Sequence, residues 1–283
     1  MSPLLPPEET ETIARMIEGT MEDSAKNVIC IKWGSSVYSA KHVNHLYRSV
    51  LKNSSYRINF YCFTDDRRDL AEGIVPRDIP PLKNVGKIGW FIYQKEVGLC
   101  DDDLGGLEGQ RVLYFDLDTI LVDSIDPFFE LPRNDEFYII EDWNHRNAMV
   151  GQASCYSWRV GALGYVKSHF EEHQEDIHRK FGSASQEYLS SKIIEKYGKL
   201  NFWPRTWCRS FKQHCLPTPL VPFLRRFREA RIPEGTKIVC FHGKPKPEDA
   251  AQGIWPEPLG YKKILYKHLR PVTWLREYLI SMI

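Results

Sequence analysis

The sequence of 283 residues is long enough to bury a full hydrophobic core, either as one large α/β unit or as a core with appendages. Apolar residues make up 42% of the chain and charged residues 27%, which is an ordinary balance for a globular protein. The net charge of +1 gives no electrostatic reason to expect a nucleic-acid partner.

Cysteine usage and the absence of long apolar runs bear on the cellular compartment. The seven cysteines are odd in number, include no CxxC pair and lie partly in apolar runs, which favours buried thiols in a reducing compartment. No apolar run reaches the roughly 18–20 residues that span a bilayer, and the acidic N-terminal stretch lacks the apolar region of a signal peptide. We therefore expect a cytoplasmic protein.

The first part of the chain alternates short apolar runs with helical patterns. Strands are expected over residues 27–33, 56–66, 73–81 and 111–118, and helices over 38–54 and 89–100. The two prolines that close 73–81 indicate an edge strand. Strands alternating with helices predict a Rossmann-like, mostly parallel central sheet flanked by helices.

The second part of the chain has a more mixed pattern. We expect a strand over 136–143, a semi-buried stretch over 154–166, helices over 167–181 and 185–198, and a late strand over 236–247. The expected organisation is an N-terminal extension (1–26), a main domain of α/β class (27–250) and a C-terminal helical tail (251–283) that packs on the domain or on a membrane surface.

Two aspartates interrupt the apolar run RVLYFDLDTILVDSIDPFF at residues 111–129. Asp116 and Asp118 end the strand expected there, and ligands of parallel sheets bind beyond the carboxyl ends of the strands. Side chains two residues apart on a strand point to the same face, so both carboxylates can approach a single ion. The simplest alternative is a turn, because aspartates at strand ends often hydrogen-bond their own backbone.

A second strand end, in the stretch CFHGKPKP at 240–247, also carries groups that suit a metal and a diphosphate. The two aspartates and the imidazole of His242, with phosphate oxygens completing the shell, would suit Mn²⁺ or Mg²⁺ in octahedral geometry. Gly243 would let the backbone approach a ligand closely, and Lys244 and Lys246 would offset the charge of a diphosphate.

At these two motifs the sequence resembles the GT-A fold glycosyltransferases, most closely the glycogenin-like and bacterial lipopolysaccharide galactosyltransferase-like group. That group places its DxD in the setting YLDxDxLVxxxIDxLF, and here the text is YFDLDTILVDSIDPFF. Its late motif is a His, one or two variable residues, a Gly and a Lys-Pro, for which this chain has FHGKPKP. The resemblance covers residues 27–247 and is sharp only at the two metal motifs.

The resemblance implies transfer of a sugar from a nucleotide-diphosphate donor, usually a UDP-sugar, with retention of the anomeric configuration. A divalent cation and lysines would then stabilise the negative charge that develops on the departing diphosphate. The metal ligands that it implies are Asp116, Asp118 and His242.

The resemblance also implies positions that hold the donor nucleotide. After the first strand, Trp33, Gly34 and Tyr38 would pack around the uracil and ribose. At the end of the second strand, Thr64 and Asp65 would hydrogen-bond the base. Further donor contacts are implied for Lys95, Asp116, Gly243 and Lys244.

Near the reacting face of the donor sugar, the family has an Asp-Gln pair, and here Gln186 and Glu187 stand in its place as catalytic candidates. The structural alternatives are core packing for Trp33 and Tyr38, and ordinary helix architecture for Lys95, Gln186 and Glu187.

Two other functions remain open from the sequence. The stretch FDLDTILVDS is close to the opening motif of haloacid dehalogenase-like phosphatases, which would use Asp116 and Asp118 as nucleophile and acid. Against this, the motif follows more than one hundred residues and no Gly-Asp dipeptide occurs after it. The third possibility is a non-catalytic protein that binds nucleotide-sugar.

Two segments near the C-terminus combine basic and apolar residues, at 222–233 and 261–283. Such segments either pack as helices on the domain or lie on an anionic membrane surface. The second outcome would place the protein peripherally at the inner face of a membrane and would suit a lipid-linked saccharide acceptor. Other saccharide or protein acceptors fit the sequence equally.

Overall fold

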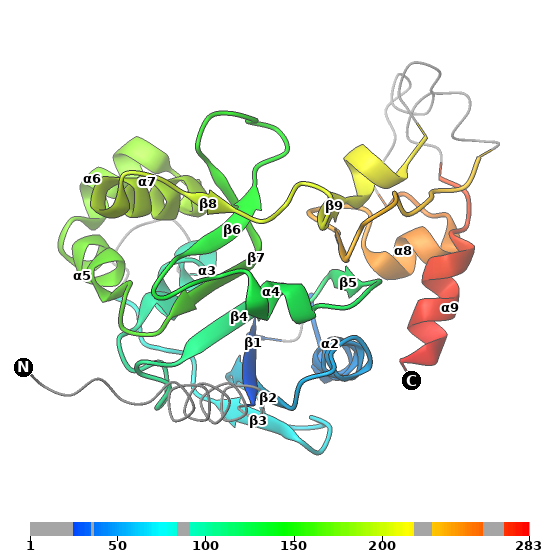
Figure 1. The fold of residues 1–283 in the computed structure, drawn as a ribbon, viewed down its shortest axis with the longest axis horizontal. Helices are drawn as coiled ribbons and strands as arrows, with labels where there is room; N and C mark the ends of the chain where they lie inside the picture. Colours follow the sequence, from blue (N-terminus) through cyan, green and yellow to red (C-terminus); the bar gives the residue numbers. More distant parts are fainter. Residues whose placement is uncertain (1–24, 35–36, 84–90, 218–227, 257–268, 283) are drawn as a thin grey trace, which may run out of the picture.

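The computed structural model describes residues 25–34, 37–83, 91–217, 228–256 and 269–282 (Figure 1). Nearly all of the expected N-terminal extension lies outside these ranges, as do residues 222–227 and 261–268 of the two basic segments. No helix in the described part of the chain is both long and apolar enough to cross a membrane.

A central seven-stranded sheet has the strand order β3-β2-β1-β4-β7-β6-β8. Its strands are β1 (Lys26–Lys32), β2 (Ile58–Thr64), β3 (Ile74–Arg77), β4 (Arg111–Phe115), β6 (Tyr138–Glu141), β7 (Gly151–Arg159) and β8 (Asn201–Phe202). The pairs β1–β2, β1–β4, β2–β3 and β6–β8 are parallel, and β7 runs antiparallel to both β4 and β6. This mostly parallel sheet confirms the predicted fold class, with β3 at the edge.

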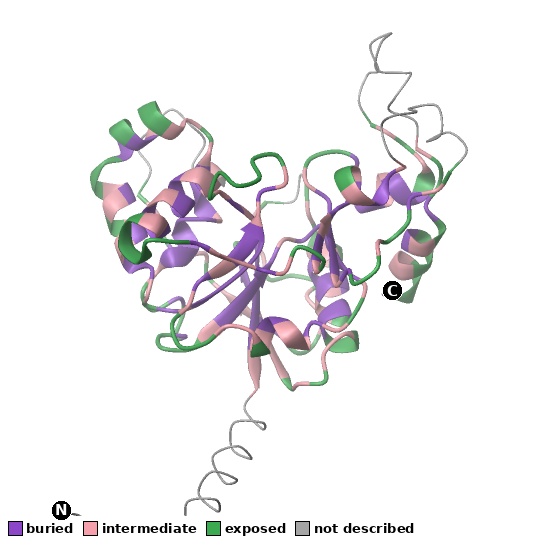
Figure 2. Cartoon of the chain, turned by 45° about the horizontal axis from the view of Figure 1, so that its top comes forward, coloured by how far each residue is buried: buried purple, intermediate pink, exposed green. Residues whose placement is uncertain are grey.

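The apolar character of the first strand follows from burial on both faces. Ile29 and Ile31 belong to a hydrophobic cluster on one side of the sheet, and Val28 and Cys30 belong to a cluster on the other side. A strand covered on both faces reads as a continuous apolar run, and Figure 2 shows the central strands as buried (purple).

Helices cover both faces of the sheet. They are α2 (Ala40–Lys52), α3 (Phe91–Gln94), α4 (Asp126–Glu130), α5 (Gly164–Glu172), α6 (Gln174–Phe181) and α7 (Ser185–Tyr197). Helices α5, α6 and α7 form one end of the molecule (Figure 1). The first cluster includes Val166, Phe170 and Leu189 from these helices, and the second includes Val43 and Leu46 from α2.

Two predicted helices differ from the observed ones. The helix expected over 167–181 is two helices, because His173 has φ −126° and ψ 30°, outside the helical region. The helix expected over 89–100 is, within the described residues, one turn at α3 and a 3₁₀ turn at Gly98–Cys100. There the Gln94 amide donates to the Pro80 carbonyl and fills the space over Gly98.

A second, three-stranded sheet has the order β5-β10-β9, formed by β5 (Thr119–Leu121), β9 (Cys208–Ser210) and β10 (Ile238–Cys240). The strand expected over 236–247 is therefore a short strand of this small sheet. It pairs with β5, which begins directly after Asp118, and the Phe241 amide donates to the Asp118 carbonyl at 3.3 Å. The pairing brings the two predicted metal motifs together.

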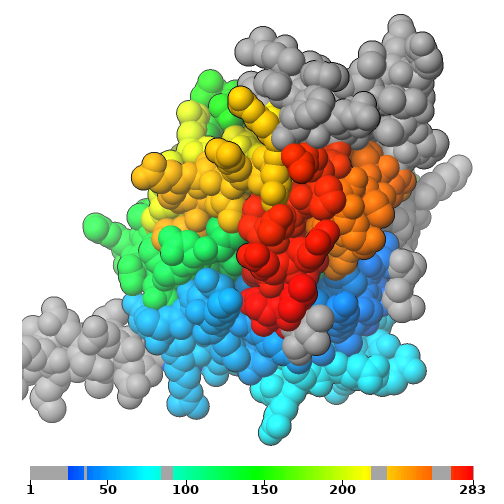
Figure 3. Space-filling view, turned by 90° about the vertical axis from the view of Figure 1, so that its right-hand side faces the viewer, coloured from blue at the N-terminus to red at the C-terminus, as the bar shows by residue number. Residues whose placement is uncertain are grey.

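The last helices pack on the small sheet. Helices α8 (Pro247–Gln252) and α9 (Thr273–Ser281) contribute Ala250 and Leu275 to a third cluster, with Phe211, Val239 and Phe241. In Figure 3, α9 (red) lies on the surface beside α8 (orange) and the blue α2 region. At the end of α9, Arg48 of α2 donates to the Met282 carbonyl.

Candidate functional site

A cavity of about 670 Å³ lies at the carboxyl ends of β1 and β4, where the sequence placed the ligand. Charged side chains and aromatic rings share its lining. The lining includes Trp33, Tyr38, Lys95, Glu96, Tyr114, Asp116, Asp118, Gln152, Ser154, His242, Gly243 and Lys246.

Asp116 follows the last residue of β4 and is fixed at both its backbone and its side chain. Its amide donates to the Ser154 carbonyl of β7 at 2.9 Å. Its carboxylate accepts hydrogen bonds from the Tyr114 hydroxyl at 2.7 Å and from the Lys95 ammonium at 3.1 Å. The side chain is therefore held in the cavity wall by a residue of β4 itself and by Lys95, which follows α3.

Asp118 is buried and faces a different cation. Its carboxylate accepts from the Tyr38 hydroxyl at 2.7 Å and from the Lys246 ammonium at 2.6 Å. Burial raises the pKa of Asp118, as does the neighbouring charge of Asp116, while Lys246 and Tyr38 act in the opposite direction. The two carboxylates thus share one electrostatic environment.

His242 lines the same cavity but has its own partners. Its Nε2 lies 2.7 Å from the Ser210 hydroxyl, and its ring stacks on Trp143 with centroids 5.3 Å apart. Burial, together with the charge of Lys212, lowers the pKa of His242 to about 4, so the imidazole is neutral at pH 7, as a metal ligand must be.

The donor set fits a metal in part. Asp116 and Asp118 supply the carboxylate oxygens that Mn²⁺ and Mg²⁺ prefer. Within the described residues, however, no three His, Cys, Asp or Glu side chains form a group that could hold a metal ion. His242 and the two aspartates share a cavity and do not form a ready three-ligand cluster.

Of the two lysines in FHGKPKP, the cavity is lined by Lys246, whereas Lys244 is exposed and outside the lining. Lys246 also donates to the Tyr38 hydroxyl at 2.5 Å, so it connects the late motif to the loop after β1. Gly243 lies in the lining with φ +75°. The positions of the two lysines in the sequence do not show which of them reaches the cavity. In the structure, the contact with Asp118 identifies Lys246.

The predicted base-binding residues fall into two groups. Trp33 and Tyr38 line the cavity. Gly34, at φ +59°, donates its amide to both carboxylate oxygens of Asp65, at 3.1 and 3.0 Å. Thr64 is buried and exchanges hydrogen bonds with the backbone of the residue two positions on. Gly34, Thr64 and Asp65 do not line the cavity; Asp65 contacts the amide of Gly34, which follows the lining residue Trp33.

Lys95 brings with it a residue that the sequence reasoning missed. Its ammonium lies 3.2 Å from Glu96 as well as 3.1 Å from Asp116. Glu96 is 5% exposed, lines the cavity and accepts a hydrogen bond from the Ser185 hydroxyl at 3.1 Å. Burial raises the pKa of Glu96, and Lys95 opposes that shift. A charged pair at the end of an apolar segment was the available signal.

Gln186 and Glu187 lie in the first turn of α7, outside the cavity lining. Gln186 accepts a hydrogen bond from the Ala153 amide at 3.4 Å, and Oε2 of Glu187 is buried without a hydrogen-bond partner. The helix start reaches the cavity through Ser185, whose hydroxyl holds Glu96.

Sequence comparison and structural comparison give different answers for this chain. No protein-family model matches the sequence, and the sequence of no functionally described protein is similar enough to match. Among solved structures, the galactosyltransferase LgtC, in complex with donor and acceptor sugar analogues, matches with a TM-score of 0.53 and 12% identity. That match covers 90% of this chain and 95% of LgtC.

Two further enzymes have similar structures. Mouse xyloside xylosyltransferase 1 matches with a TM-score of 0.52 and 13% identity, over 78% of this chain and 98% of that one. The bifunctional glycosyltransferase WbbM matches with a TM-score of 0.52 and 11% identity, over 90% of this chain and 51% of that one. The protein therefore has the GT-A glycosyltransferase fold, as the sequence predicted.

Proposed function

We propose that the protein is a metal-dependent glycosyltransferase that moves a sugar from a nucleotide-diphosphate donor, a UDP-sugar in the first instance, to a saccharide, lipid-linked or protein acceptor. One observation carries the proposal. Two carboxylates, Asp116 and Asp118, share a cavity of about 670 Å³ with the ammonium groups of Lys95 and Lys246 and the rings of Trp33 and Tyr38, at the ligand-binding edge of a GT-A sheet.

Each group in the cavity has a chemical task in this reaction. Trp33 and Tyr38 offer aromatic surface for the base and ribose. Lys95 and Lys246 face the region where a diphosphate would gain negative charge as the glycosidic bond breaks, and they stabilise that charge electrostatically. Lys246, rather than Lys244, takes the phosphate-binding role in this proposal.

A divalent cation belongs to the proposal as well. Mn²⁺ or Mg²⁺ would be held by Asp116 and Asp118, with His242 as the third proposed ligand. The bound ion would act as a Lewis acid on the leaving diphosphate. The remaining catalytic candidates, Gln186 and Glu187, lie in the first turn of α7, outside the cavity lining. In this proposal they would influence the donor sugar indirectly, through the position of that helix start.

Isothermal titration with UDP, in the presence and absence of Mn²⁺, tests donor binding, and nucleotide release from a panel of UDP- and GDP-sugars tests turnover. We expect UDP binding that depends on Mn²⁺. We also expect that Asp116→Asn and Asp118→Asn each lower nucleotide release at least about 100-fold while the circular dichroism spectrum is unchanged. Asp123→Asn is the matched control, because that carboxylate is exposed and pairs with Lys237.

Near-normal turnover in either cavity variant would contradict the metal assignment. UDP binding that requires Mn²⁺, with no turnover of any sugar nucleotide, would favour a non-catalytic binding protein. Release of phosphate from simple monoesters, abolished by the same variants, would instead favour the phosphatase alternative.

The place of action is part of the same proposal. A cytoplasmic enzyme whose basic segments at 222–233 and 261–283 contact an anionic membrane surface would meet a lipid-linked acceptor. Co-sedimentation of the full-length protein with vesicles of neutral or anionic lipid tests this contact, and equal partitioning into both kinds of vesicle would contradict it.

A further inference from the structure

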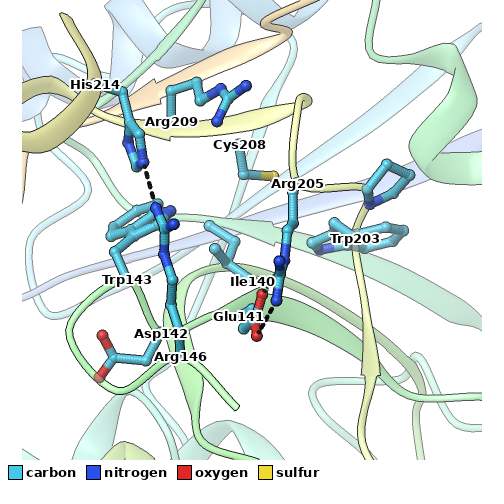
Figure 4. Close-up of a pocket in the computed structure, with 11 residues that line it drawn as sticks. Ile140, Glu141, Asp142, Trp143, Arg146, Trp203, Arg205, Cys208, Arg209 and His214 are labelled. Atoms are coloured by element: carbon cyan, nitrogen blue, oxygen red, sulfur yellow. Dashed lines mark hydrogen bonds and ion pairs between the residues drawn. The ribbon is translucent and has the colours of Figure 1, made fainter.

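A second, smaller pocket lies beside the donor cavity, and basic and aromatic side chains dominate its lining (Figure 4). Its volume is about 60 Å³, which suits one small polyatomic group. We call it the basic pocket, defined by Trp143, Arg146, Trp203, Arg205, Arg209 and His214. Trp143 connects it to the donor cavity, because this ring stacks on His242, which lines that cavity.

The acidic residues at the basic pocket are already engaged. Glu141 accepts two hydrogen bonds from Arg205, at 2.6 and 2.9 Å. Asp142 is held by the His145 ring at 3.0 Å and the Asn144 amide at 2.8 Å, and Figure 4 shows its carboxylate pointing away from Arg209. Both carboxylates are therefore occupied by hydrogen-bond partners other than Arg209.

Arg209 has no such partner. Its Nε is buried and makes no hydrogen bond, and no acidic side chain of the described residues forms an ion pair with its guanidinium. A guanidinium carries only N–H donors and no acceptor, so leaving the buried Nε–H of Arg209 without a partner is costly. An oxyanion in the pocket would accept from Nε–H and a neighbouring Nη–H together, in the bidentate geometry that arginine favours.

A second observation points to the same ligand. The Ser210 amide donates to Nδ1 of His214 at 2.9 Å, so the proton of a neutral His214 ring must lie on Nε2. Burial lowers the pKa of His214, with the charges of Arg209 and Arg146 adding to the effect, and the ring is neutral at pH 7. Nε2 lies 3.2 Å from Nη2 of Arg146, which can only donate. Two donors therefore lie next to each other, and one oxygen of an oxyanion placed beside the pair, within hydrogen-bond distance of both nitrogens, would accept from both.

We propose that the basic pocket binds a carboxylate or phosphate group carried by the sugar acceptor. This inference rests on the proposed function, because it takes the larger cavity as the donor site. The acceptor would then lie on one side of the stacked Trp143 and His242 rings, and the donor diphosphate on the other. The acceptor class is then an acidic saccharide, such as a uronic acid or a sugar phosphate, with its ring near Trp143 and its anionic group at Arg209, Arg146 and His214.

The test measures binding of three small probes by isothermal titration to the full-length protein saturated with UDP and Mn²⁺. The probes are glucose, glucuronate and glucose 6-phosphate, which share a ring and differ in the anionic group. We expect at least one of the two anionic probes to bind about tenfold more tightly than glucose, with a preference that weakens as NaCl is added.

Two variants localise that preference. Arg209→Gln removes the unpartnered guanidinium, and Arg146→Gln removes an exposed one, so the second keeps the test valid if the first fails to fold. Each should reduce the preference to about threefold or less. Arg179→Gln is the matched control, because this exposed arginine of α6 pairs with Asp176 far from the pocket, and it should leave the preference unchanged.

Equal affinities for all three probes would overturn the inference, as would an undiminished preference in both pocket variants. Competition between UDP and the anionic probes would overturn it too, because the pocket would then serve the donor. Donor hydrolysis in the same preparation separates the two proposals. Hydrolysis without any preference for anionic probes contradicts only the acceptor assignment, and an Arg209-dependent preference without hydrolysis contradicts only the transferase assignment.

Discussion

The Lys95 ammonium lies between two carboxylates, 3.2 Å from that of Glu96 and 3.1 Å from that of Asp116. Removing one partner of a buried pair leaves the other charge uncompensated, which is more costly than losing the attraction alone. We expect Lys95→Met to lower the free energy of unfolding by about 3 kcal/mol at pH 7, measured by urea denaturation without nucleotide. The double variant Lys95→Met with Glu96→Gln is the control and should recover part of the loss. Equal stability of the single and double variants would show that Lys95 and Glu96 are not coupled.

Individual residues show what the sequence could reveal about the site. Asp116 and Asp118 were identifiable because their signal is local: two carboxylates two residues apart at the end of an apolar run. Glu96 was not singled out, because its contact with Ser185, 89 residues further on, exists only in the folded chain. Lys246 was named together with Lys244 as a balance for diphosphate charge, and only its contact with Asp118 in the folded chain shows which of the two lysines reaches the cavity. Arg209 carried no local signal, since its lack of an acidic partner among the residues that the structure describes is a property of the folded chain.

Among the elements, α4 is hydrogen-bonded to the turn after α2 through the carboxylate of its first residue, Asp126. Asp126 accepts hydrogen bonds from the Ser54 hydroxyl at 2.8 Å and from the Ser55 amide and hydroxyl at 3.0 and 2.8 Å. Burial alone would raise the pKa of Asp126, but these hydrogen bonds outweigh it and the pKa lies below its ordinary value. The ionised form is therefore the one that the fold stabilises.

The pH dependence follows from that shift. A lowered carboxyl pKa contributes stability that is complete above the unfolded value of about 4 and is lost as pH falls through the folded pKa. We expect Asp126→Asn to cost about 1–3 kcal/mol at pH 7 in urea denaturation, with the gap to wild type closing below about pH 4. Asp123→Asn, whose carboxylate is 59% exposed, should cost less than about 1 kcal/mol. A gap of constant size at all pH values would contradict this assignment.

Elements with a periodic pattern were predicted well and interrupted ones were not. The continuous apolar run at β1 and the spacing of Val43, Leu46 and Val50 in α2 directly reflect the faces that they bury. The break at His173 and the short α3 depend on local dihedral angles and on the Gln94 side chain, which hydropathy does not encode. The alternation of strands and helices therefore gave the fold class, and the boundaries required the structure.

At the scale of the whole molecule, the site depends on how the small sheet docks against the large one. Strands β5 and β10 are more than 100 residues apart in the chain, and their pairing places Asp118 beside the segment that leads to His242. No periodic pattern in the sequence predicts such a pairing. The cluster that supports it includes Val239 and Phe241 next to the site and Leu275 of α9, so the C-terminal helix bears on the geometry of the site.

Leu275 gives a direct test of that arrangement, because it is completely buried in the cluster, whereas Ile280 of the same helix is 63% exposed. We expect Leu275→Ala to lower the free energy of unfolding by about 2–5 kcal/mol, and Ile280→Ala to change it by no more than about 0.5 kcal/mol. Both are measured by urea denaturation of the full-length protein in the absence of lipid. If α9 were instead a membrane-surface tail detached from the small sheet, neither Leu275 nor Ile280 would be buried in the absence of lipid. Both substitutions would then have equally small effects on the free energy of unfolding. A large difference between them therefore requires that α9 packs on the small sheet in solution, and any contact with lipid would have to leave that packing in place.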